Sequence, residues 1–135
     1  MWEHFAHQAD VGIRATAAGL SSAFEDAAIA LTAIVTDPKN VQPLECVKLE
    51  CDAEDEELLL VNWLNSIIYE MATGKMLFGK FEVNIEGLTV SAKIWGEKID
   101  QARHLPAVEP KAVTYNQLSV KEEKGKWTVQ CVIDV

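Results

Sequence analysis

The sequence predicts an α+β protein in which two helices pack on one face of a mostly antiparallel β-sheet, forming a two-layer sandwich. Two observations lead to this class. Two segments repeat their apolar residues at helical spacing, and several others alternate apolar and polar residues as strands do. Two amphipathic helices cannot close a core alone, so they must cover a sheet. No linker or internal repeat interrupts the chain, so residues 1–135 are expected to form a single domain.

A strand and a helix open the predicted order. Residues 10–16 alternate, which is the pattern of a strand. Ser22 and Glu25 have the spacing of a capping box, which predicts the start of a helix. Apolar residues then recur at helical spacing as far as Val35, and Pro38 ends the helix because the residue before a proline avoids the α region.

A second strand and a second helix follow. Residues 47–51 alternate, and residues 52–57 then place five carboxylates in six positions. These acids could form a binding cluster. The favoured interpretation is that Asp52 caps the helix and the acids stabilise its first turn through the helix dipole. The apolar stripe of this helix runs from Leu58 to Met71, and Gly74 is its expected end.

The rest of the chain is expected to form two hairpins. Residues 81–94 alternate on either side of a turn at Gly87. Residues 113–135 do the same around Gly125, and the apolar register of the first strand shifts near Leu118. That shift predicts a β-bulge.

Charge and composition limit the kinds of partner. The formal net charge is −9, and such an acidic protein lacks the basic surface that holds a nucleic-acid backbone. A role in RNA metabolism would therefore run through a protein partner. The three cysteines show no paired short spacing, which argues against a disulfide framework or a thiolate zinc site.

The chain is expected to be soluble and cytoplasmic, with no membrane partner. Residues 1–4 lack the basic start and apolar run of a signal peptide. No apolar stretch approaches the length that spans a bilayer.

Three residues are candidates for function. Asp10 begins a strand, where Gly12 leaves room for another group to approach the backbone, and Asp134 lies among the core-facing apolar residues of the last strand. If they converge, their carboxylates and the oxygens of Val135 would suit a hard cation such as Ca²⁺. Lys111, at the start of a strand, could balance these acids or contact an anion. The alternative for all three is a solvated side chain at a strand end.

Patterns of independent catalysis are missing from the sequence. There is no glycine-rich phosphate loop, no His-Glu-x-x-His helix and no nucleophile elbow, and the three histidines lack metal-site spacing. We therefore expect that the protein is not an enzyme.

Four segments resemble the archease family, in the family's order and from near the first residue to the last. Residues 7–13, His-Gln-Ala-Asp-Val-Gly-Ile, are similar to the opening motif of archeases, although Gln8 stands where threonine is usual. Residues 55–65 resemble the acidic start and Trp-Leu-Asn of their second helix. Residues 111–115, Lys-Ala-Val-Thr-Tyr, match a family signature, and Trp127 with residues 132–135 matches the C-terminal strand.

Two further positions bear on the resemblance. His104 fits a histidine that is common before the signature lysine. Asn116 stands where a histidine usually follows the tyrosine, so any role of that histidine is not carried over.

The resemblance implies a function and a site. Archeases are accessory proteins of RtcB-type GTP-dependent RNA ligases, which they help to become guanylylated and to turn over repeatedly in tRNA splicing and RNA repair. The family's calcium site would correspond to Asp10, Asp134 and Val135, and its important lysine to Lys111. Mg²⁺ or Mn²⁺ could replace Ca²⁺, because such sites are selected by cavity size and rigidity. RNA would be met only indirectly, through the ligase.

Two other function classes remain open at this point. A chaperone-like modulator of other RNA-processing or modifying proteins would not need Asp10. A stand-alone metal-dependent hydrolase would need a base and a nucleophile that the sequence does not reveal.

Overall fold

The computed structural model describes all 135 residues, whose strands form two separate antiparallel sheets. The four-stranded sheet has the order β1-β2-β7-β6. Its strands are β1 (Trp2–His7), β2 (Asp10–Ala17), β7 (Lys126–Asp134) and β6 (Ala112–Glu123). The three-stranded sheet has the order β3-β5-β4. Its strands are β3 (Glu45–Asp52), β5 (Thr89–Lys98) and β4 (Met76–Glu86).

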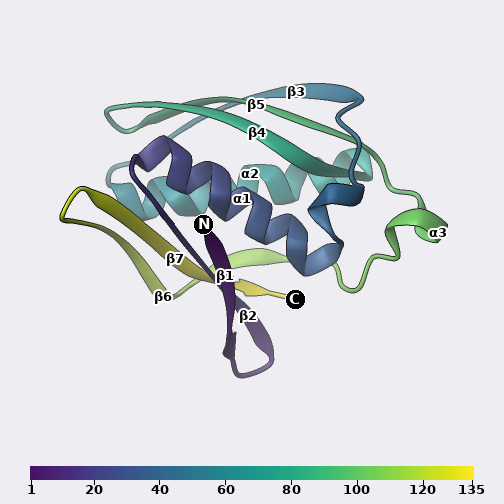
Figure 1. Ribbon diagram of the computed structural model, residues 1–135, viewed down its shortest axis with the longest axis horizontal. Helices are drawn as coiled ribbons and strands as arrows, with labels where there is room; N and C mark the ends of the chain where they lie inside the picture. The colour runs from purple at the N-terminus through teal and green to yellow at the C-terminus, as the bar shows by residue number, and fades with distance from the viewer.

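The helices α1 (Leu20–Val35) and α2 (Glu56–Gly74) lie between the two sheets (Figure 1). The α+β class and the antiparallel pairing are confirmed, but the expected single sheet with helices on one face is corrected to two sheets with helices between them. The reason is visible in α1, which buries nine of its 16 residues. A helix that is apolar around more than one face must be covered on more than one side.

The start of α1 corrects the predicted capping box. Gly19 is the N-cap and makes no side-chain bond, and Ser22 is exposed. Glu25 instead accepts a hydrogen bond from the Val83 amide of β4 at 2.8 Å. Ser21 accepts one from the Ile85 amide at 3.1 Å. These side chains thus satisfy amides on the edge strand of the smaller sheet, where unpaired backbone groups would otherwise be left.

The start of α2 lies three residues later than predicted. Asp55, and not Asp52, is the N-cap, and its carboxylate accepts a hydrogen bond from the Leu58 amide at 2.8 Å. Glu56 and Glu57 occupy the first turn, so the acidic run is explained as a helix start. The helix ends at Gly74, as expected.

The hairpins β4–β5 and β6–β7 are confirmed, and the register of β6 shifts between Thr114 and Ser119 as the predicted bulge requires. Strand β1 was not predicted, because its side chains are mostly exposed and show no apolar alternation. It covers Gly12, where an added Cβ would lie 2.3 Å from the Phe5 ring. The room that this glycine leaves is therefore filled by the protein itself.

A continuous core of 32 buried residues joins the layers. The connecting elements are the short helices η1 (Pro38–Asn40) and α3 (Gln101–His104). No helix offers the length of apolar sequence needed to cross a membrane.

Candidate functional site

The pairing of β2 with β7 brings Asp10 and Asp134 to the same end of the larger sheet. Val11 pairs with Ile133, and the next residues outward on these antiparallel strands are Asp10 and Asp134. Residues directly opposite each other across antiparallel strands point to the same face of the sheet. The convergence that sequence spacing could not show thus follows from the register of the backbone.

The backbone of Lys111, the residue before β6, is bonded to the same end of the sheet. Its amide donates a hydrogen bond to the backbone oxygen of Asp134 at 2.8 Å, and Ala112 pairs with Asp134. The start of β6 is held in turn by α2, because Asn65 accepts a hydrogen bond from the Val113 amide at 3.0 Å. We call the group Asp10, Lys111, Asp134 and Val135 the acidic edge.

The charged side chains of the acidic edge are two carboxylates and one lysine. Asp10 and Asp134 are half-buried, whereas Lys111 is exposed. None of the four ion pairs in the molecule includes any of these residues.

The donor set suits a hard divalent cation in kind, although not in number. Two carboxylates and the backbone oxygen of Val135 are ligands that Ca²⁺ accepts, but Ca²⁺ takes about six to eight oxygens. The His, Cys, Asp and Glu side chains form no group of three or more that could hold a metal ion. The missing ligands would have to be water or oxygens of a partner.

The helix motif Trp-Leu-Asn has a structural role. Trp63 is fully buried, and its indole N–H donates a hydrogen bond to the backbone oxygen of Phe24 at 3.0 Å, which joins the two helices. Asn65 positions the start of β6, as described above. These residues therefore set the position of Lys111 without belonging to the acidic edge.

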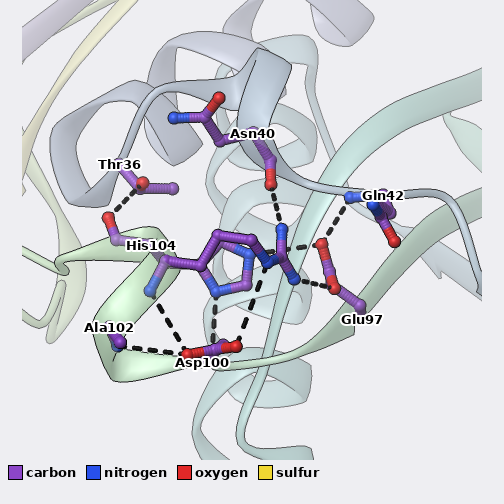
Figure 2. Close-up of polar contacts among 8 residues, drawn as sticks. Thr36, Asn40, Gln42, Glu97, Asp100, Ala102 and His104 are labelled. Atoms are coloured by element: carbon purple, nitrogen blue, oxygen red, sulfur yellow. Dashed lines mark hydrogen bonds and ion pairs between the residues drawn. The ribbon is translucent and has the colours of Figure 1, made fainter.

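A second polar cluster lies at the C-terminal end of β5 and contains Glu97, Arg103 and His104 (Figure 2). Glu97 is only 5% exposed and forms an ion pair with Arg103. Its carboxylate also accepts a hydrogen bond from the Gln42 amide at 2.6 Å. The hydrogen bond from Arg103, followed by those from Gln42 and His104, lowers the pKa of Glu97 from 4.5 to about 2, although burial opposes the shift.

The hydrogen bonds of His104 define its tautomer. The Asp100 amide donates to its Nδ1 at 2.9 Å, so Nδ1 carries no proton. Nε2 lies 3.2 Å from a carboxylate oxygen of Glu97 and is the donor in that contact. His104 is thus a buried structural histidine.

This cluster anchors residues 99–110, which we call the strap. Thr36 donates a hydrogen bond to the backbone oxygen of His104 at 2.6 Å, and the Ala107 amide donates to Val35 at 2.9 Å. The strap leads directly into Lys111. Sequence reasoning missed Glu97 and Arg103, because no spacing relates them to His104 before the loop is folded.

The fold and the acidic edge define a small α+β protein that presents two half-buried carboxylates at one end of a sheet. The chain matches the model of the Archease protein family (MTH1598/TM1083) over residues 2–135. The protein archease of Sulfurisphaera tokodaii is 38% identical, over 99% of this chain and 98% of that protein. The protein archease of Pyrococcus abyssi is 37% identical over the same shares of the two chains.

Solved structures agree in fold. The solution structure of protein 1598 of Methanobacterium thermoautotrophicum matches with a TM-score of 0.87 and 31% identity, over 99% of this chain and 98% of that one. An archease of Thermotoga maritima, described as a possible chaperone, matches with a TM-score of 0.64 and 16% identity, over 97% and 94%. The chain belongs to the archease family.

Proposed function

We propose that this protein activates an RtcB-type GTP-dependent RNA ligase, by promoting guanylylation of the ligase and repeated turnover. The observation that carries the proposal is the acidic edge of this archease-family chain. Asp10 and Asp134 lie at the same end of the sheet through the register of β2 with β7, and the Lys111 amide is bonded to the Asp134 oxygen. An accessory protein can act only if it binds two states of its partner with different affinity. The acidic edge would favour the state of the ligase that accepts the nucleotide.

The chemistry of the acidic edge supports a role through a metal and a partner, and not through catalysis by this chain. Asp10, Asp134 and the backbone oxygen of Val135 would hold Ca²⁺, Mg²⁺ or Mn²⁺, and the ion would supply positive charge for a phosphate or a carboxylate. Lys111 is exposed and could contact a phosphate beside it. The net charge of −9 suits a ligase that is itself basic in order to hold RNA.

The test is ligation of tRNA halves by the cognate ligase at low concentration, with and without this protein. We expect the ligase alone to stop near one equivalent and to continue when the protein is added. Asp10→Ala and Asp134→Ala should lose activation, and Lys111→Ala should weaken it. The exposed lysine variant Lys121→Ala is the control and should activate fully.

Full activation by both aspartate variants, each shown to be folded, would contradict the role of the acidic edge. No effect of the wild-type protein on ligation, with any of the three metals, would contradict the ligase proposal itself.

A second candidate is a chaperone-like modulator of other RNA-processing proteins. It is favoured by the description of the Thermotoga maritima archease as a possible chaperone. A chaperone should suppress aggregation of unrelated proteins, and Asp10→Ala should leave that activity unchanged. The two candidates are therefore separated by the same variant.

A further inference from the structure

The smaller sheet ends at β3, and the outer edge of this strand has no neighbouring strand. β3 pairs with β5 without a register shift, and the Ala53 amide continues the pairing by donating to the Leu88 oxygen at 3.3 Å. In an antiparallel pair, alternate residues bond the neighbouring strand, and the residues between them direct their backbone groups the other way. The odd-numbered residues of β3 therefore bond β5, and the even-numbered residues face outward.

Side chains cover the edge of β4 but leave most of the edge of β3 open. At β4, side chains of α1 accept hydrogen bonds from the outward-facing amides, as described above. At β3, the Asp52 oxygen accepts a hydrogen bond from the Asn62 side chain at 2.8 Å, which agrees with an outward direction for the even-numbered residues. The outward backbone groups of Lys48 and Glu50 meet no strand or side chain. Such an edge is a template for pairing with another strand.

Apolar side chains beside this edge are also incompletely covered. Val47, Leu49 and Cys51 alternate along β3 and are only half-buried. Leu49 and Cys51 line a groove together with Tyr69 of α2, whose side chain is 65% exposed. A further strand beside β3 would remove part of this apolar surface from water, which is favourable.

The charges along the edge are complementary to a second copy of the same strand. Two copies of β3 related by a two-fold axis run antiparallel, and their outward-facing, even-numbered residues must lie opposite one another. With the axis at Leu49, Lys48 of each chain lies opposite Glu50 of the other. Moving the axis by one residue places Lys48 opposite Lys48 or Glu50 opposite Glu50, and like charges directly opposite are destabilising. A lysine on an edge strand usually prevents pairing, but here Glu50 makes one register favourable.

We propose that β3 docks a second copy of this chain, so that the two smaller sheets join into one continuous sheet about an axis at Leu49. The proposal does not depend on the ligase. The acidic edge belongs to the larger sheet, on the other side of the helices from β3, so the dimer leaves it accessible (Figure 1). The net charge of −9 opposes association, which should therefore be stronger at about 150 mM salt, where the Debye length is about 8 Å, than at low salt.

Sedimentation of the full chain over a range of concentrations tests the dimer. We expect the average mass of the wild type to rise with concentration from that of one chain towards that of two. Lys48→Glu and Glu50→Lys should each weaken the dimer about tenfold or more, because each places like charges opposite one another. The double variant Lys48→Glu/Glu50→Lys should restore it. Lys121→Glu, at an exposed position of β6, makes the same charge change as Lys48→Glu and should dimerise like the wild type.

Disulfide trapping tests the register. In a chain carrying Cys46→Ser and Cys51→Ser, we expect Leu49→Cys to cross-link two copies on mild oxidation. Residues opposite each other in a pair without hydrogen bonds have Cα atoms about 4.5 Å apart, which suits a disulfide. Val47→Cys in the same background is the control and should not cross-link, because it lies opposite position 51 of the copy. Thermal unfolding of each variant establishes that it is folded.

Three outcomes would overturn the proposal. One is a wild type that stays monomeric up to about 1 mM. Another is a dimer that Lys48→Glu leaves intact, or that Val47→Cys traps and Leu49→Cys does not, because the interface or the register would then be different. The third is a monomeric wild type whose binding to the ligase is lost in Lys48→Glu, which would assign the edge of β3 to the ligase in place of a second copy.

Discussion

Glu97 shows how much one buried carboxylate depends on its partners. It is held by Arg103, by His104 and by the Gln42 amide, and its pKa is lowered to about 2. A group whose pKa is lower in the folded than in the unfolded state stabilises the fold above its unfolded pKa. For Glu97, that stability is present above about pH 4.5 and is lost as the pH falls towards 2.

We therefore expect Glu97→Gln to lower the free energy of unfolding at pH 6, and the difference from wild type to shrink between pH 4.5 and 2. Urea unfolding at several pH values measures this difference. Glu45→Gln, an exposed carboxylate of β3, is the control and should change little. A difference that stays constant with pH would show that the charge of Glu97 does not contribute.

Asp134 provides a second prediction at this scale, independent of any ligase. If the acidic edge binds Ca²⁺, a hundredfold excess over Kd stabilises the fold by about 2.7 kcal/mol through linkage. Thermal unfolding with and without Ca²⁺ should show this for the wild type and not for Asp134→Asn. Glu122→Gln, at an exposed position of β6, should behave like the wild type. Equal stabilisation of Asp134→Asn would place the ion elsewhere.

Helix α1 and strand β4 illustrate how elements depend on one another. At the edge strand β4, Ser21 and Glu25 of the helix accept the backbone hydrogen bonds that a neighbouring strand would otherwise accept. Thr32, further along α1, donates a hydrogen bond to the Phe78 oxygen at 2.6 Å. These three residues are separated by four and seven positions, so they lie along one face of the helix.

Ser21→Ala and Ser22→Ala separate this arrangement from the predicted capping box. Ser21→Ala leaves the Ile85 amide without its partner and should lower the free energy of unfolding by about 1 kcal/mol. Ser22 is exposed and makes no such bond, so Ser22→Ala should change it by less than about 0.5 kcal/mol. Chemical denaturation measures both, and the opposite ranking would restore the capping box.

The whole molecule is strongly acidic, with a net charge of −9. This protein alone should therefore not bind tRNA halves in a gel-shift assay, even at low salt, because phosphates are repelled. Its association with a basic ligase should weaken between about 50 and about 300 mM salt, since salt ions screen the attraction between opposite charges. Tight RNA binding by the isolated protein would contradict an indirect role.

Local patterns determined much of this protein. Alternation located most strands, helical spacing located both long helices, and the register shift in β6 located its bulge. Asp10, Lys111 and Asp134 were identified as candidates because each begins or ends a strand in a motif similar to the archease family. These signals are readable because each depends on residues close together in the sequence.

Features that depend on contacts between residues far apart in the sequence were decided only by the tertiary structure. Asp10 and Asp134 come together through the register of β2 with β7, and the side chain of Glu25 bonds an amide 58 residues away. The division of the strands into two sheets, and the burial of Glu97, also depend on how layers pack. The physical reason is that periodicity specifies which face of an element is apolar, whereas the partner of that face is selected by long-range packing and hydrogen bonding.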